Sequence, residues 1–155
     1  MKIVSGRNGT TGVLSALDSI EGAELPDGSK PVLTRATEGV EHSDVNTVVR
    51  YGALPPGSGN QTGGVYVGGK LAYVQIDISD ISVLPGSTYS DGSPKTLETV
   101  LAHEMGHAYR IINAQANLGL LGEELTVSGL ENQYRFAQGI QQRQYYGTYE
   151  LKQYP

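Results

Sequence analysis

The spacing of apolar residues along the chain predicts an alternation of short helices and strands. A helical spacing predicts a helix over residues 11–20, and a run of β-branched residues predicts a strand over residues 45–52. The stretch 54–64 is rich in glycine and proline and predicts a loop. After it, two runs separated by Gly-Gly predict a hairpin of strands 65–67 and 71–78. The even-numbered positions of the second strand are the more apolar, so we expect that face to contact the core.

Two longer helices are predicted in the second half of the chain. The first begins after Ser93, which can cap it, has Pro94 at its first position, and extends to about Ala116. The second spans residues 123–140, and the aromatic tail that follows shows no pattern of regular structure. Together these elements predict an α+β fold in which a small antiparallel sheet packs on two or three helices.

Length and composition narrow the class of protein. The 155 residues are expected to form a single domain, residues 1–155. The net charge of -5 argues against nucleic acid or an anionic membrane as a partner. The absence of cysteine excludes disulfides, thiolate metal ligands and a cysteine nucleophile. No segment resembles a membrane span or a signal peptide, so export would need another route, and the chain could also be the released end of a larger toxin polypeptide.

One motif in the first long helix carries specific chemistry. In "VLAHEMGHAYR", His103 and His107 lie one turn apart on the same helix face, so both imidazoles can bind one metal ion such as Zn²⁺. Glu104 is rotated by about 100° from His103 and can reach a water held by the metal, as a general base must. Gly106 is unfavourable inside a helix, and we expect it to let another segment approach closely.

A zinc hydrolase needs a third protein ligand. A third histidine in the common extended motif is excluded because Arg110 and Asn113 occupy its glycine and histidine positions. The remaining histidine, His42, lies far upstream in a polar segment that we expect to be solvated. The third ligand is therefore expected to be a carboxylate from the second long helix.

Three glutamates of that helix are candidates for the ligand: Glu123, Glu124 and Glu131. Glu124 and Glu131 are seven residues apart and share a face, whereas Glu123 is offset by about 100°. We favour Glu124 as the ligand. Glu131 would then orient a ligand or pair with Arg135 one turn on.

The tail carries two further polar groups, Arg143 and Tyr146, three residues apart. A guanidinium or a phenol aimed at the tetrahedral intermediate of peptide hydrolysis would stabilise its negative charge. From the spacing alone, however, a packing or solvated role for these residues is the better interpretation.

The three motifs together resemble a known family. "LAHEMGHAYR", "GEELTVSGLENQYRFAQG" and "RQYYG" resemble the NleD-like effector zinc metallopeptidases, bacterial toxins that are injected into other cells or carried at the ends of Rhs-type toxins. The active-site plan is also similar to that of clostridial neurotoxin light chains. The resemblance implies that Glu124 is the third zinc ligand and that Arg143 and Tyr146 stabilise the transition state. Val127 stands where such peptidases often have a small residue, which leaves Glu131 open as an alternative ligand.

The expected protein is therefore a gluzincin-like zinc endopeptidase of effector or toxin type. The resemblance implies secretion by a signal-peptide-independent route, a protein or peptide substrate in a target cell, and an immunity protein or secretion-system carrier as partner. Two other classes stay open: a zinc amidase that acts on cell-wall peptides with the same ligands, and a non-catalytic binding module in which the two histidines are structural.

Overall fold

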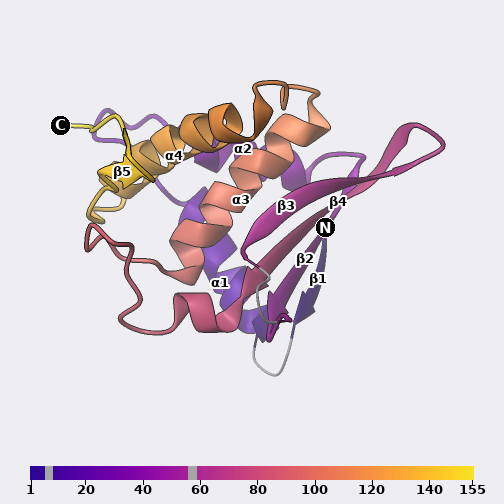
Figure 1. Cartoon of the computed structure of the whole chain (residues 1–155), viewed down its shortest axis with the longest axis horizontal. Helices are drawn as coiled ribbons and strands as arrows, with labels where there is room; N and C mark the ends of the chain where they lie inside the picture. Colours follow the sequence, from indigo (N-terminus) through magenta and orange to yellow (C-terminus); the bar gives the residue numbers. More distant parts are fainter. Residues whose placement is uncertain (6–8, 56–58) are drawn as a thin grey trace.

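A mixed four-stranded sheet forms one layer of the molecule, and the four helices lie on one side of it (Figure 1). The computed structural model describes residues 1–5, 9–55 and 59–155. The strand order is β1-β2-β4-β3, in which the first three strands are parallel and β3 is an antiparallel edge strand. The strands are β1 (Lys2–Ser5), β2 (Asn46–Gly52), β3 (Gln61–Val67) and β4 (Lys70–Ser79).

The α+β class is confirmed, but the sheet is not the antiparallel one that the sequence predicted. Only the β3–β4 hairpin matches that prediction. Strand β1 was not predicted, and it pairs in parallel with β2 because two helices carry the chain back to the same end of the sheet. The loop predicted over 54–64 was wrong at its end, since β3 begins at Gln61, and residues 56–58 of that loop lie outside the described part.

The helices are α1 (Gly9–Glu21), α2 (Val32–Glu41), α3 (Leu97–Ile112) and α4 (Gly119–Ala137), and a short 3-10 helix, η1 (Asp80–Val83), follows β4. Helix α1 confirms the helix predicted over 11–20. Helix α2 was not predicted. Its buried face includes Thr34 and Thr37, whose hydroxyls donate to the carbonyl oxygens of Ile20 and Leu33, so the apolar spacing is interrupted in the sequence.

The predicted start of α3 was three residues early. Thr96, not Ser93, caps the helix, accepting a hydrogen bond from the Thr99 amide in a capping box. The Ser93 hydroxyl instead donates to Asp91 at 2.6 Å within the preceding turn. The helix also ends at Ile112, before the predicted Ala116. The second helix begins at Gly119 and ends at Ala137, so its predicted bounds shift toward the N-terminus.

The core lies between the sheet and helices α1 and α3. Val74, Ile76 and Ile78 of β4 are fully buried, which confirms the predicted core face at these positions, whereas Ala72 at the start of that face is exposed. Leu101 and Met105 of α3 are fully buried against the same cluster. Helix α3 therefore lies directly on the sheet, while α4 packs against α3 on the other side.

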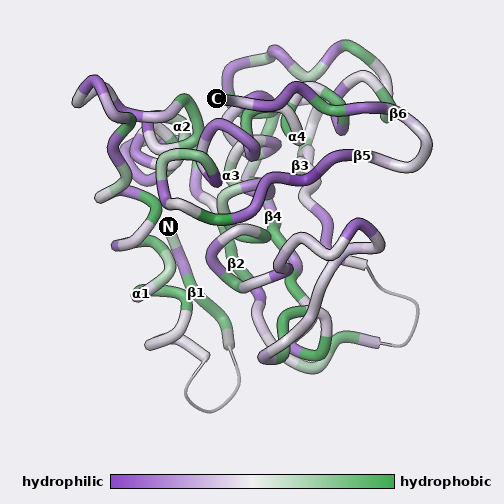
Figure 2. The backbone as a smooth tube through the Cα atoms, turned by 90° about the vertical axis from the view of Figure 1, so that its left-hand side faces the viewer, coloured by the Kyte–Doolittle hydropathy of each residue, from purple (hydrophilic) through white to green (hydrophobic). Residues whose placement is uncertain are grey.

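The C-terminal tail contains a small hairpin that the sequence did not predict. Strands β5 (Tyr145–Tyr146) and β6 (Tyr149–Glu150) pair in antiparallel register, with Gly147 at a φ of 59° in the turn. This segment is mostly hydrophilic, in contrast to the apolar stretches of the sheet and α1 (Figure 2). Among the described residues, no helix combines the length and the apolar character that crossing a membrane would require.

Candidate metal centre

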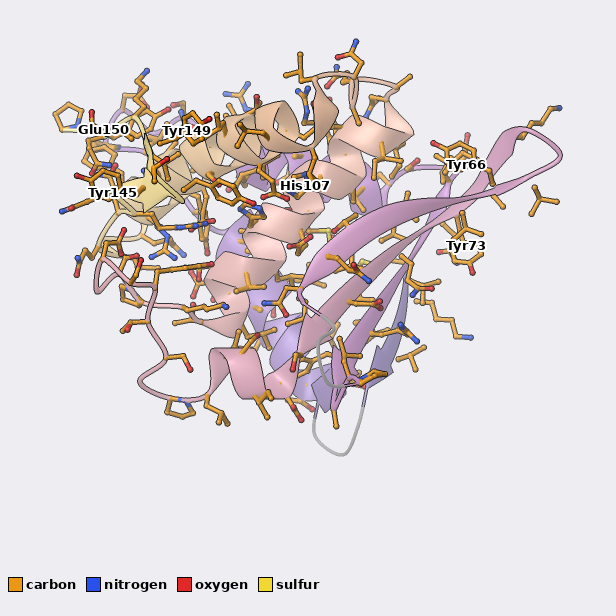
Figure 3. All side chains as sticks on the ribbon, in the orientation of Figure 1. Tyr66, Tyr73, His107, Tyr145, Tyr149 and Glu150 are labelled. Carbon is orange, nitrogen blue, oxygen red and sulfur yellow. The ribbon has the colours of Figure 1, made fainter. Side chains whose placement is uncertain are left out.

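Helices α3 and α4 bring three side chains with nitrogen and oxygen donors to one point. The Nε2 atoms of His103 and His107 lie 3.1 Å apart, since the residues are one helical turn apart. The Glu124 carboxylate reaches across from α4. Its Oε2 atom lies 3.1 Å from Nε2 of His103, and its Oε1 atom lies 3.1 Å from Nε2 of His107. In Figure 3, His107 lies between the two helices. These are the three residues of the predicted ligand set.

The separations between the donors suit a tetrahedral ion. Ligand atoms at 2.0–2.1 Å from a tetrahedral Zn²⁺ stand about 3.3 Å from one another. The Nε2–Nε2 distance of 3.1 Å is close to this value, and each Nε2 atom lies 3.1 Å from a different oxygen of Glu124. Two imidazoles and one carboxylate form the donor set of catalytic zinc sites, in which the fourth position is left for water or substrate. The residues present therefore fit the metal.

The pKa values of His103 and Glu124 reflect the same geometry. Burial alone would lower the pKa of His103, but hydrogen bonds to Glu124 and Glu131 raise it to about 10 when no metal is bound. Burial alone would raise the pKa of Glu124, but hydrogen bonds with His103 and His107 hold it well below its usual range. The point where the donors meet therefore favours a positive charge, either a proton or a metal cation.

Glu131 contacts the opposite side of the His103 ring. Its Oε1 atom lies 2.8 Å from Nδ1 of His103, and its Oε2 atom accepts a 2.6 Å hydrogen bond from Nε of Arg135. Arg143 adds a third contact at 3.2 Å, and the Glu131 side chain is fully buried. The Glu131 contacts turn Nε2 of His103 toward Glu124 and His107. The structure thus places Glu124, not Glu131, with the histidine Nε2 atoms, and Glu131 pairs with Arg135 as its spacing predicted.

Glu104 and Glu123 lie on either side of the three donors but differ in their contacts. The Glu104 carboxylate accepts a 2.5 Å hydrogen bond from the hydroxyl of Thr62 on the edge strand β3. Glu104 also lines two cavities that adjoin the centre. Glu123 lines only the larger of these cavities and accepts hydrogen bonds of 2.7 and 3.0 Å from Arg110.

Arg143 and Tyr146 line the smaller cavity, of about 200 Å³, together with His103, Glu104 and Glu124. The fold therefore gathers five predicted site residues at one cavity. Arg143 and Tyr146 are among them, although their spacing alone favoured a packing role.

One residue of α4 fixes the position of this tail. The buried Asn132 side chain accepts a 2.8 Å hydrogen bond from the Arg143 amide and donates one of 2.7 Å to the Arg143 carbonyl. Sequence reasoning missed Asn132, although it lies next to Glu131 in "GLENQYR". It also missed Thr62, Tyr89 and Lys95 at the cavities, which lie in segments without any chemical motif.

The expected close approach at Gly106 is confirmed. A Cβ atom at this position would lie 2.7 Å from Cδ2 of Leu33 on α2 and 3.0 Å from Cγ1 of Val127 on α4. Both neighbours contact the bare helix backbone between the two histidines. Val127, which departs from the family pattern, therefore has a packing role here.

Comparison with known proteins yields no relative. No protein-family model matches this chain, and no curated protein or solved structure matches it. The resemblance to NleD-like peptidases therefore stays a prediction, and the function has to be inferred from the chemistry of the site.

Proposed function

We propose that this chain is a zinc-dependent endopeptidase whose metal is held by His103, His107 and Glu124. The observation that carries the proposal is the convergence of these three donors at 3.1 Å, with the Glu104 carboxylate lining the adjoining cavities. When bound, Zn²⁺ supplies a Lewis acid that polarises the scissile carbonyl and lowers the pKa of the attacking water.

Glu104 is the general base of this proposal. Its carboxylate would take a proton from the attacking water and pass it to the leaving amine nitrogen. The hydrogen bond from Thr62 holds one carboxylate oxygen at 2.5 Å and leaves the other free to face the substrate. Thr62 is therefore a positioning residue for the base.

Arg143 and Tyr146 are proposed to stabilise the oxyanion. They line the same cavity as His103 and Glu104, where negative charge develops on the carbonyl oxygen. The Asn132 hydrogen bonds hold the Arg143 backbone against α4, so the guanidinium is fixed before substrate binds.

The substrate is proposed to bind as an extended strand along β3. This strand is the sheet edge nearest the centre, and Gln61 and Thr62 line the larger cavity with His107. The free backbone groups of an edge strand can pair with a peptide. Tyr73 lies on the inner strand β4 and well away from His107 (Figure 3), so β3 rather than β4 would make these contacts.

We also propose, from the sequence resemblance, that the enzyme acts as a secreted effector or toxin on a protein in a target cell. An immunity protein or a secretion-system carrier would be its partner. These assignments rest on the motifs quoted above.

The test combines metal content with cleavage. Wild-type protein should bind one Zn²⁺ per chain by elemental analysis and generate new N-termini in a cell proteome. Glu104→Gln should keep the zinc and lose nearly all cleavage, whereas the matched control Glu24→Gln, at an exposed position after α1, should keep both. Cleavage of peptidoglycan fragments but not of proteins would favour the amidase, and absence of stoichiometric zinc would favour a binding module and overturn the proposal.

A further inference from the structure

The smaller cavity beside the metal centre has a basic wall formed by Lys95 and Arg143, of which Lys95 has no part in the proposed catalytic roles. We propose that this wall binds a carboxylate of the substrate next to the scissile bond, and that Lys95 is its specificity-determining residue. The carboxylate would be that of an acidic side chain, because an endopeptidase cleaves away from the free carboxyl end of its substrate. This inference rests on the proposed peptidase function and names its substrate class.

Positive charge is concentrated around one aromatic ring in this cavity. The Tyr89 ring has the Arg143 guanidinium carbon 3.9 Å from its centroid, the Lys95 ammonium at 5.3 Å and the Arg135 guanidinium carbon at 5.7 Å. Tyr89, Lys95 and Arg143 all line the cavity. Three cations around one ring repel one another unless nearby anions compensate their charge. The three cations differ in whether they already have such a partner.

Arg135 is fully engaged with other groups. It pairs with Glu131 through Nε and donates to the carbonyl oxygens of Gln141 and Pro94 at 2.9 and 2.7 Å. It is also completely buried and does not line the cavity. Each nitrogen of Arg135 thus already has a partner, and the side chain forms a structural ion pair away from the cavity.

Lys95 and Arg143 differ from Arg135 in this respect. Within residues 1–5, 9–55 and 59–155, no carboxylate lies within 4.0 Å of the Lys95 ammonium. Arg143 is 6% exposed, contacts Glu131 through Nη1 alone, and has a buried Nε atom without a hydrogen-bond partner. A ligand oxygen that accepts a hydrogen bond from this buried donor would offset the cost of its desolvation.

The cavity on the other side of the centre has a different chemistry. Its volume is about 440 Å³, and Ile111, Ala116 and Leu120 give it apolar surface. Its outer carboxylate, Glu123, is already paired with Arg110. A carboxylate is therefore favoured on the Lys95 side only, while an apolar side chain suits the other side.

The experiment uses one peptide series that differs only at the residues flanking the cleaved bond. Glu, Gln or Lys is placed there, each with a free or an amidated carboxyl end. We expect kcat/KM to be about tenfold higher for Glu than for Gln, the size expected of one charge-assisted contact. A preference for internal Glu supports the inference, and a preference for the free carboxyl end without one for internal Glu would overturn it.

Reversal of the charge provides the decisive variant. Lys95→Glu should abolish the preference for Glu and raise cleavage of the Lys peptide. Lys2→Glu makes the same charge change on β1, at the opposite edge of the sheet, and should leave the preference intact. Equal cleavage of all three peptides by wild type, or an unchanged preference in Lys95→Glu, would overturn the inference while leaving the peptidase function in place.

A binding assay keeps the inference testable without turnover. Zinc-loaded Glu104→Gln protein should bind the acidic peptide about tenfold more tightly than the Gln peptide in calorimetry, and the added Lys95→Glu change should remove this difference. If no peptide is cleaved by wild type but this Lys95-dependent difference is present, the peptidase proposal fails and the carboxylate site stands. If the two peptides bind equally, the carboxylate site fails.

Discussion

Nδ1 of His103 lies 2.8 Å from Oε1 of Glu131, on the side of the ring that faces away from Glu124. The contact fixes which imidazole nitrogen would meet the proposed metal. Glu131→Gln should therefore lower zinc affinity by about 10–100-fold, measured by competition with a chelator. It should also destabilise the fold by about 3–5 kcal/mol in urea unfolding, because Arg135 loses its buried partner. A variant with unchanged zinc affinity would show that Glu131 has only a structural role.

The hydroxyl of Thr62 connects the edge strand to the proposed base. Thr62→Val keeps the shape of the side chain but removes the donor to Glu104, so kcat should fall by about tenfold, a fraction of what a general base contributes. Zinc content should not change, and Thr62→Ser should restore most of kcat. Equal loss in the Val and Ser variants would indicate a packing effect instead.

Asn132 connects α4 to the C-terminal tail, donating also to the Lys152 carbonyl at 3.0 Å. Asn132→Ala should free the tail and displace Arg143, lowering kcat by about 100-fold, as for the loss of an oxyanion donor, while zinc remains bound. Limited proteolysis should then cleave after residue 140 in the variant but not in wild type. A tail that stays resistant in the variant would contradict this role.

The ends of α1 and α2 carry two glutamates whose interaction makes stability depend on pH. A hydrogen bond with Glu41, together with burial and the charge of that neighbour, raises the pKa of Glu21 to about 7. A carboxyl whose pKa is raised on folding stabilises the protein below about pH 4.5, and this contribution is lost as the pH rises through 7.

Glu21→Gln should therefore be more stable than wild type at pH 8, by about 1 kcal/mol after allowance for solvent screening. The difference should vanish near pH 4, as measured by urea unfolding at both values. A constant difference between the two pH values would exclude the interaction as its source.

The centre was easier to predict than the sheet, for physical reasons. His103, Glu104 and His107 lie within one helical turn and a half, so helix geometry alone places them. Strand β1 is only four residues long and pairs with a strand far along the chain, a relationship that no local pattern records.

The sequence alone also could not decide which of two glutamates is the third ligand. Glu124 and Glu131 share a face of α4, and both contact His103, one on each ring nitrogen. Only the packing of α4 on α3 decides which carboxylate meets Nε2. Lys95 lies in a segment without periodicity, so its position beside the centre depends on the fold of the loop before α3.

The bare backbone at Gly106 has a consequence for metal selectivity. Leu33 of α2 and Val127 of α4 pack on α3 between the two histidines, so the distance from α3 to α4 is set at a point where α3 has no side chain that could yield. The reach of the Glu124 carboxylate is set by that distance. A change in the distance between α3 and α4 at this position would move Glu124 relative to the two histidines. The radius of the divalent ion that fits between them would therefore depend on helix packing as well as on ligand type.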